Sequence, residues 1–559
     1  MRIPLPVRSG ILLASLLLSA CAIRAAGRQK AATQSGSAAT PSDPILETMR
    51  VELARSKANL KMENVPAPYY IEYQLSDLDE YSAEAAFGAL RGRGRIHTRM
   101  LRVVVRVGDY KQDSYYGPGE GVADLAPLDD DPIALRWQLW VATDEAYKRA
   151  NLALAMKKAA LSRYTADQPF DDFAHAPAVR SIQPIVRLDF DAKYWEAAIQ
   201  SATNLYRTDP KIESLDANVQ FRAVNEYFVN TEGSEVREGY AEYSLALNGT
   251  TQAADGMRLS RGPYYVASDW HELPSAQQFQ ADTTKMVATL KALREAPLVD
   301  EEYRGPVLFS SDAASDVFAG MVGQNVLGIR PRPGESARTA EEYSSNYKSR
   351  VLPDFVSVLD DPTVKTFQGK SLTGSYQIDD EGVRAAKVPL IENGQLVNYL
   401  LGREPIRDFA ESNGHGRAAP GRAPTPSIGT LIVESKQAVS PEDLKKKLMD
   451  LCRQEGKPYG YYAETLAGDI NPRLLYRVYA SDGHEELVRG AVFNELDTRA
   501  LRNDLIAVGN DPLVSNREGA IPETVISPSI LFDEIEVKRT DGKNAKLPDY
   551  PAPDLISRH

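Results

Sequence analysis

Cysteine and histidine are scarce in this sequence. Its 559 residues include two Cys and six His. Two cysteines are too few for a disulfide-stapled fold, and a metal site that needs several thiolate or imidazole ligands must draw on a small pool. No two His residues stand three or four positions apart, so the sequence offers no helix that presents a His pair to a metal.

Other common signals of function are also missing. The sequence contains neither the Gly-x-Ser-x-Gly turn of serine hydrolases nor a Gly-x4-Gly-Lys-Ser/Thr phosphate loop. Basic residues are not in excess, because 65 Lys and Arg stand against 77 Asp and Glu, for a net charge of −12. A nucleic-acid-binding protein carries a basic footprint, so we expect no nucleic-acid partner.

The remaining composition is that of a globular protein. Hydrophobic residues make up 43% of the chain and charged residues 25%. At roughly 100–200 residues per domain, the length accommodates two or three domains. We expect two large ones behind an N-terminal leader: an N-terminal domain at residues 43–299 and a C-terminal domain at residues 300–559.

The N-terminus has the pattern of a targeting leader. Arg2 and Arg8 precede a short apolar run that ends at Leu18. This run is much shorter than the roughly 20 residues needed to span a bilayer. This pattern predicts a signal peptide at residues 1–20. The run ends in Leu-Ser-Ala-Cys21, which resembles a bacterial lipobox with Cys21 acylated as the first mature residue; cleavage after Ala22 is the alternative.

A polar stretch and a cellular location follow from this leader. Residues 21–42 are rich in Ala, Ser, Gly and Gln and predict a flexible tether. The leader predicts a protein of the bacterial cell envelope, secreted across the inner membrane. It is a lipoprotein held at the membrane by its anchor if Cys21 is acylated, and a periplasmic protein otherwise.

Periodicity and turn residues predict an α+β fold. The N-terminal domain is expected to be α/β, with a mixed sheet, and the C-terminal domain to be rich in strands. The predicted helices begin at Asp43-Pro44, at Pro132, near Trp195, at Gln277 and at Ser440-Pro441. The predicted strands and turns include Tyr69–Leu75, Leu101–Val107, several strands within 212–247 that turn at Asn230–Ser234, a hairpin at Asn393-Gly394, and a loop at Ala410–Ser427.

Several segments of the second half, taken in order, resemble the TldD/PmbA family of metallopeptidase-related proteins, once described as modulators of DNA gyrase. Each segment is weakly specific alone, and their order over about 250 residues carries the resemblance. The first half adds only Asn230-Thr-Glu-Gly233. The segments of the second half are Gly305–Leu308, Asp379–Val383, Leu390–Leu396, Asn413–Arg417, Pro424–Ser427, Leu487–Gly490 and Ala507–Asp511.

The resemblance implies a metal site whose ligands are replaced in this chain. Active members of the family carry His-Glu-x-x-x-His on a helix after the first of these segments. Aligned on Val322-Gly323, this chain has Ala319 and Gly320 at the positions of the first His and the Glu, and Gln324 at that of the second His. The later metal-binding Cys of the family is missing from residues 512–524. Zinc is expected in active members, and here we expect no cofactor.

This resemblance leads to one functional expectation and two alternatives. We expect a family member of the PmbA type with a degenerate site, a pseudoenzyme that binds peptides or partners a motif-bearing relative, as a heteromer or as a homodimer. One alternative is an active peptidase that uses other residues, with His415 and Asp379 or Asp380 as the candidates. The other alternative is a structural protein of envelope assembly.

The remaining candidates each have a plain structural interpretation. His415 lies between two glycines, so it either faces a substrate or sits in a solvent-facing turn. Asp379 and Asp380 could line a functional wall, although acidic runs in loops are more often solvated turns. Cys452 lies on the predicted helix after Ser440 and is expected to be a small buried hydrophobic residue.

Overall fold

The computed structural model describes residues 43–163, 170–205, 211–332, 335–468 and 470–540. The chain divides into two compact units, residues 1–42 and residues 43–559. The predicted signal peptide, the acylation of Cys21 and the tether therefore lie outside the described residues. The predicted boundary at 299–300 falls between a helix and a strand of the second unit and stays a prediction.

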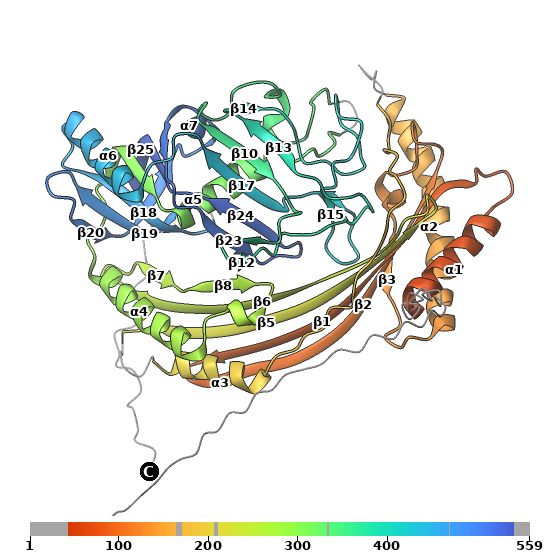
Figure 1. The fold of residues 1–559 in the computed structure, drawn as a ribbon, viewed down its shortest axis with the longest axis horizontal. Helices are drawn as coiled ribbons and strands as arrows, with labels where there is room; N and C mark the ends of the chain where they lie inside the picture. The colour runs from red at the N-terminus through yellow and green to blue at the C-terminus, as the bar shows by residue number, and fades with distance from the viewer. Residues whose placement is uncertain (1–42, 164–169, 206–210, 333–334, 469, 541–559) are drawn as a thin grey trace, which may run out of the picture. The chain divides into compact units, whose positions relative to one another are not determined.

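The N-terminal part is built on one long, curved sheet (Figure 1). Its central strands run antiparallel in the order β2, β1, β5, β6, with short strands at both edges. β4 pairs with β6 in parallel, so the sheet is mixed as expected. Its strands are β1 (Pro68–Ala86), β2 (Ala89–Val107), β3 (Val122–Leu125), β4 (Arg180–Ile182), β5 (Ser214–Asn230), β6 (Glu235–Gln252), β7 (Arg258–Arg261) and β8 (Tyr264–Ala267).

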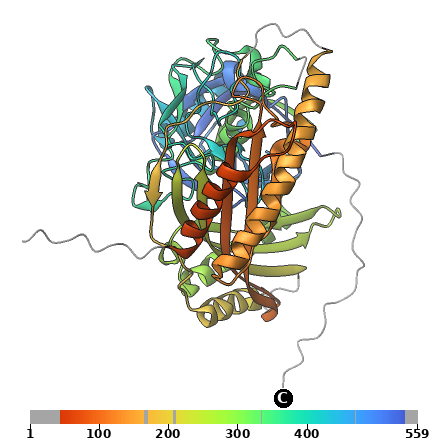
Figure 2. The ribbon, with the colours of Figure 1, turned by 90° about the vertical axis from the view of Figure 1, so that its right-hand side faces the viewer.

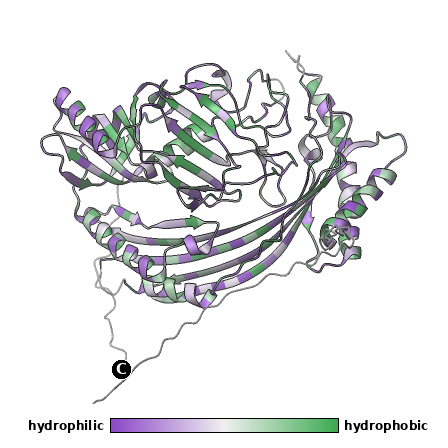
Figure 3. Ribbon diagram, viewed as in Figure 1, coloured by the Kyte–Doolittle hydropathy of each residue, from purple (hydrophilic) through white to green (hydrophobic). Residues whose placement is uncertain are grey.

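Helices cover one face of this sheet. The residues of β1 that point to this face include Ile71, Tyr73, Tyr81 and Ala83, and all of them are buried. Near one end they pack against α1 (Pro44–Asn59) and α2 (Pro132–Leu161), and near the other against α3 (Ala192–Thr203) and α4 (Ala276–Glu295). The alternation of hydrophobic and hydrophilic residues along the strands is visible in Figure 3. It leaves the other face polar.

The polar face of the long sheet lies against the C-terminal part. Gln74 of β1 donates from Nε2 to the carbonyl oxygen of Asp380 at 2.7 Å. Glu238 of β6 accepts hydrogen bonds from the backbone N–H groups of Gln377 and Ile378, at 2.8 and 3.0 Å. Direct hydrogen bonds therefore join the N-terminal sheet to the C-terminal part within the second unit.

Two further sheets form the C-terminal part. One has the order β14-β13-β10-β17-β24-β23, and the other has β20-β19-β18-β9-β25-β21 with β22 also on β25. The first contains β10 (Val356–Asp360), β13 (Val388–Glu392), β14 (Gln395–Leu396), β17 (Thr430–Ser435), β23 (Leu513–Arg517) and β24 (Glu523–Ser527). The second contains β9 (Glu302–Phe309), β18 (Tyr459–Leu466), β19 (Pro472–Tyr479), β20 (Glu485–Val488), β21 (Ala491–Asn494), β22 (Leu505–Val508) and β25 (Ile530–Arg539).

Helices and short elements complete this part. One large cluster of buried side chains lies between its sheets. The fold class is α+β, as predicted. The remaining elements are α5 (Ser311–Phe318), α6 (Pro441–Gln454), α7 (Thr498–Asn503), β11 (Thr366–Phe367), β12 (Lys370–Ser371), β15 (Gly416–Arg417), β16 (Thr425–Pro426) and the short helical turns η1 (Gly117–Glu120), η3 (Trp270–Glu272), η4 (Ala319–Gly323) and η5 (Glu342–Ser345).

The elements with strong local signals are found where they were predicted. Asp43 and Ser440 cap α1 and α6, α2 begins at Pro132, and Asn393-Gly394 joins β13 to β14. Asp131 caps α2, which was not predicted. The long strands were underestimated: Tyr69–Leu75 and Leu101–Val107 are parts of two 19-residue strands, and the region 212–247 contains two long strands instead of several. Their polar ends carry a weak strand signal, and pairing with neighbours on both sides extends them.

Within the ranges that the structure describes, no helix combines the length and the apolar character of a membrane span.

Candidate functional site

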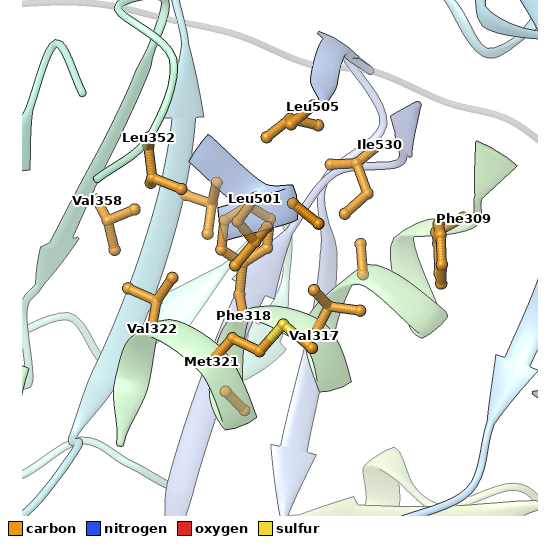
Figure 4. Close-up of a cluster of buried hydrophobic side chains, with 14 of the residues drawn as sticks. Phe309, Val317, Phe318, Met321, Val322, Leu352, Val358, Leu501, Leu505 and Ile530 are labelled. Carbon is orange, nitrogen blue, oxygen red and sulfur yellow. The ribbon is translucent and has the colours of Figure 1, made fainter. Parts of the chain in front are cut away.

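The candidate site lies along α5, the helix that follows strand β9. Ser310 caps this helix, because its Oγ accepts a hydrogen bond from the N–H of Ala313 at 3.1 Å. Val317, Phe318 and Val322 point from α5 and η4 into the main C-terminal core (Figure 4). The opposite side of the helix carries Asp312, Asp316, Gly320 and Gln324, which recur every four residues. Because one side of the helix is packed into the core, the row on the opposite side is held in a fixed position facing away from the core.

The positions of the family's metal motif fall at the end of this helix. Ala319 is buried, whereas Gly320 and Gln324 are exposed. The chain here forms a π-turn in which the N–H of Gln324 donates to the carbonyl oxygen of Ala319 at 3.2 Å. A Cβ atom on Gly320 would lie 3.1 Å from Cδ1 of Ile470, so an aliphatic side chain occupies the adjoining space.

These residues do not fit a zinc ion. Ala319 and Gly320 have no donor atom, and a single amide oxygen from Gln324 is a poor zinc ligand. Within the described ranges, no three His, Cys, Asp or Glu side chains are grouped so that they could hold a metal ion.

A cavity of about 890 Å³ opens beside α5. We call it the α5 cleft. Asp312 and Asp316 line it from the helix, and α4, β8, β19 and β23 contribute the other walls. Its lining is mixed: apolar groups such as Leu273 and Met286 alternate with charged groups of both signs. A cavity of this size and character can take a ligand of several residues that is itself partly apolar and partly polar.

Burial changes the ionisation of the charged groups in the α5 cleft. Arg517 forms an ion pair with Asp316. Burial nevertheless raises the pKa of Asp316, and burial together with the neighbouring Asp316 charge raises the pKa of Asp312. Burial lowers the pKa of Arg261, whose Nη1 donates to Oγ1 of Thr465 at 3.3 Å. The cleft is thus poorly solvated at these groups, where hydrogen bonds to a ligand are stronger than in water.

An edge strand runs along the α5 cleft. β23 is the last strand of its sheet, and among the described residues it pairs only with β24. The six consecutive residues from Leu513 to Glu518 all line the cavity. Asn516 fixes the strand in place, because its Nδ2 donates to the carbonyl oxygens of Val266 and Ser371 at 3.1 and 2.9 Å. An edge strand presents unpaired backbone groups, which can pair with another extended chain.

The structure places His415 in the interior. The side chain is fully buried, so it is not part of a solvent-facing turn. Its Nε2 lies 3.1 Å from Oδ1 of Asp360, and its Nδ1 lies 3.1 Å from two oxygens of Asn413. The partner of His415 is therefore Asp360, instead of Asp379 or Asp380.

Asp379 and Asp380 hold the neighbouring loop in place. Asp379 is buried, and its carboxylate accepts hydrogen bonds from the backbone N–H groups of Glu381, Val383 and Gly416. Asp380 Oδ2 accepts from Nε of Arg417 at 3.0 Å and from the N–H of Ala418 at 2.7 Å. Both carboxylates thus stabilise a loop.

One further sequence expectation is confirmed, and one group of site residues was missed. Cys452 is fully buried on α6, as predicted. The residues that line the α5 cleft were not predicted. The four-residue spacing of Asp312 and Asp316 was visible in the sequence, but their partner Arg517 lies about 200 residues further along the chain, and nothing local connects them.

Comparisons with known proteins agree with this architecture. Residues 302–539 match the family model described as PmbA/TldA metallopeptidase C-terminal domain. The chain is 46% identical over 70 residues to a metalloprotease of Methanocaldococcus jannaschii and 40% identical over 96 residues to one of Methanothermobacter thermautotrophicus. These matches cover 12% and 17% of this chain and only 14% and 18% of the two relatives.

Longer matches are more distant in sequence. A metalloprotease TldD homologue of Buchnera aphidicola is 22% identical over 364 residues, which is 60% of this chain and 70% of that protein. The structure of a protein described as a modulator of a DNA gyrase from Thermotoga maritima covers 88% of this chain and 99% of its own, with 16% identity and a TM-score of 0.59. TldE from Thermococcus kodakarensis covers the same shares, with 13% identity and a TM-score of 0.58. At these identities the structural matches show the fold alone.

Proposed function

Since this chain belongs to the TldD/PmbA family, we propose that it is a member that binds peptides in the α5 cleft without hydrolysing them. The observation that carries the proposal is the identity of three residues. Ala319, Gly320 and Gln324 stand where active members hold the metal-binding and proton-transferring groups. Ala and Gly can neither ligate a metal nor move a proton.

The lining of the α5 cleft supports an extended peptide as the ligand. A peptide laid along β23 can pair its backbone with the outer edge of this strand, which contributes hydrogen bonds that do not depend on sequence. Tyr264, Leu273 and Met286 offer apolar contacts to its side chains, and Arg261 offers a positive charge. The five residues of β23 all line the cleft and span about 17 Å, enough for a peptide of similar length.

The location and the partners are part of the same proposal. Cys21 is acylated, and the protein acts at the surface of the envelope membrane. Hydrolysis of the bound peptide requires a partner with an intact motif, so we propose a heteromer with a motif-bearing relative over a homodimer. A pull-down from the native membrane, followed by mass spectrometry, tests this association.

Binding and cleavage can be measured together. We expect the purified full chain to bind fluorescent unstructured peptides in an anisotropy assay and to leave them intact by mass spectrometry. Methyl groups on every second backbone nitrogen of the peptide should remove binding when those nitrogens face β23. The same methyl groups placed one residue further along the peptide should leave binding unchanged. Cleavage by protein that contains stoichiometric zinc contradicts the proposal.

A variant pair tests the location of the peptide. Arg261→Glu reverses a half-buried charge in the α5 cleft and should weaken binding at least about tenfold, the equivalent of 1.4 kcal/mol. Arg304→Glu is the matched control, because Arg304 lies on β9 outside the cleft lining. Equal affinity of the two variants would place the peptide elsewhere.

A further inference from the structure

Helix α2 exposes a row of large apolar side chains. Ile133 is 67% exposed, Trp137 60%, Trp140 45% and Val141 50%. Their spacing of four, seven and eight residues from Ile133 places them on one side of the helix. The rings of Trp137 and Trp140 pack edge to face, with centroids 5.0 Å apart. We call these four residues the α2 outer face.

The α2 outer face is not needed for the fold. The opposite side of the helix, which includes Leu135, Leu139 and Ala146, is buried against the N-terminal sheet and α1. Leu125 and Leu128, in the segment before the helix, are exposed as well. Exposed apolar groups gathered in this way mark an interaction surface more often than chance.

Several charged side chains along α2 are paired within the chain. Lys148 Nζ lies 2.6 Å from Asp144, Arg149 pairs with Glu145, and Arg136 Nε lies 3.1 Å from Glu52. The acidic run at residues 129–131, directly before α2, adds negative charge that does not attract lipid headgroups. Attraction at this face must therefore come from apolar burial and from the indole rings. This chemistry suits the boundary between lipid headgroups and acyl chains, where Trp is favoured.

The course of the chain favours a lipid surface as the occupant. α1 begins at Pro44, directly after the N-terminal 42 residues, and α1 and α2 lie side by side over the sheet (Figure 2). Cys21 precedes Asp43 by 22 residues, which reach at most about 75 Å when fully extended. An acyl group on Cys21 therefore keeps the bilayer within reach of α2.

We propose that the α2 outer face docks onto the surface of the membrane that holds the lipid anchor. Ile133, Trp137, Trp140 and Val141 enter the headgroup region, and the anchored protein is thereby oriented with α2 toward the bilayer. That the bilayer lies within reach of α2 depends on the proposed acylation of Cys21. The affinity of the α2 outer face for lipid does not depend on it.

Vesicle flotation with unacylated protein tests the docking. The full chain with Cys21→Ser should float with vesicles of neutral phosphatidylcholine, and about 0.5 M salt should not release it, because the attraction comes from apolar burial and salt screens only charges. Combined Ile133→Ser, Trp137→Ser and Trp140→Ser should lower the bound fraction at least tenfold. Ile96→Ser, which removes an Ile that is 61% exposed on β2, is the matched control and should bind like the parent.

The outcomes separate this proposal from its rivals. Equal flotation of the triple variant and the control overturns it. Sedimentation equilibrium that shows a dimer in the parent and a monomer in the triple variant, without vesicle binding by either, also overturns it and assigns the face to a second copy of the chain. Mass spectrometry of the membrane-derived protein tests the acylation of Cys21 separately, so a failure there leaves the vesicle result standing.

Discussion

At the scale of single residues, buried carboxyl groups connect the loops around Asp379. Glu381 is buried, and its Oε2 accepts a hydrogen bond from the N–H of Arg403 at 2.6 Å. A Cβ atom on Gly416 would lie 2.1 Å from this oxygen, so a larger residue there would have to displace the Glu381 carboxyl group. Burial raises the pKa of Glu381 to about 8 and that of Asp379 to about 7. These groups thus favour the folded chain when they are protonated.

This burial predicts a pH dependence of stability. In the unfolded chain both groups ionise near pH 4, whereas the folded chain keeps its protons up to pH 7–8. Their stabilising contribution is therefore complete below pH ~4 and is lost as the pH rises through 7–8. We expect the free energy of unfolding in urea to fall between pH ~5 and ~9, and Glu381→Gln to reduce this fall by about 2 kcal/mol.

The control for this prediction is an exposed residue of the same type. Glu295 has a largely exposed side chain, and Glu295→Gln should leave the pH dependence as it is in the parent. An unchanged slope in Glu381→Gln would mean that Glu381 ionises in the folded chain as it does in water.

At the scale of the element, the β13–β14 hairpin shows how a local signal is enforced by its surroundings. Asn393 and Gly394 both have positive φ angles, 49° and 79°, as a two-residue hairpin turn requires. The turn also packs closely, because a Cβ atom on Gly394 would lie 2.3 Å from the carbonyl oxygen of Leu352. Two separate constraints therefore select glycine here.

Alanine substitutions can separate these two constraints. Gly456 also has a positive φ, 67°, but no atom lies within 4 Å of a Cβ atom there. We expect Gly456→Ala to cost about 1–2 kcal/mol of unfolding free energy, the price of a left-handed alanine. Gly394→Ala should cost about 3 kcal/mol or more, because the chain must also move away from Leu352. Equal losses in urea denaturation would show that the contact with Leu352 relaxes freely.

At the scale of the whole described unit, Arg403 joins the C-terminal part to the N-terminal sheet. The side chain is fully buried. Its Nε and Nη2 donate to the carbonyl oxygen of Ala174 at 3.0 and 2.7 Å, and Nη1 lies 2.8 Å from Oε2 of Glu232. Glu232 lies in the turn between β5 and β6, so one guanidinium bridges three distant segments.

Loss of this bridge should be costly. Arg403→Met keeps much of the volume but leaves the Glu232 carboxylate and the Ala174 carbonyl without their partner. We expect a loss of about 3–5 kcal/mol in the free energy of unfolding. Arg304→Met, at an exposed arginine of β9 whose ion pairs with three glutamates are screened by water, is the control and should cost much less. A small loss in Arg403→Met would show that other contacts carry this interface.

The sequence by itself determined the features that depend on neighbouring residues. Helix caps at Asp43 and Ser440, the start of α2 at Pro132, the Asn393-Gly394 turn and the buried Cys452 all follow from local patterns. Periodicity and turn residues likewise predicted the α+β fold. The replacement of the metal motif at Ala319, Gly320 and Gln324 stays a prediction from the resemblance, which the contiguity of the motif in sequence made possible.

Tertiary structure alone decided which distant residues meet. His415 pairs with Asp360, 55 residues away, and Arg517 pairs with Asp316, 201 residues away. The α5 cleft, the position of β23 at the edge of its sheet and the exposed side of α2 likewise depend on how whole elements pack. Local periodicity shows that a residue belongs to a face, but the packing of that face is set by the burial of apolar surface over the entire chain.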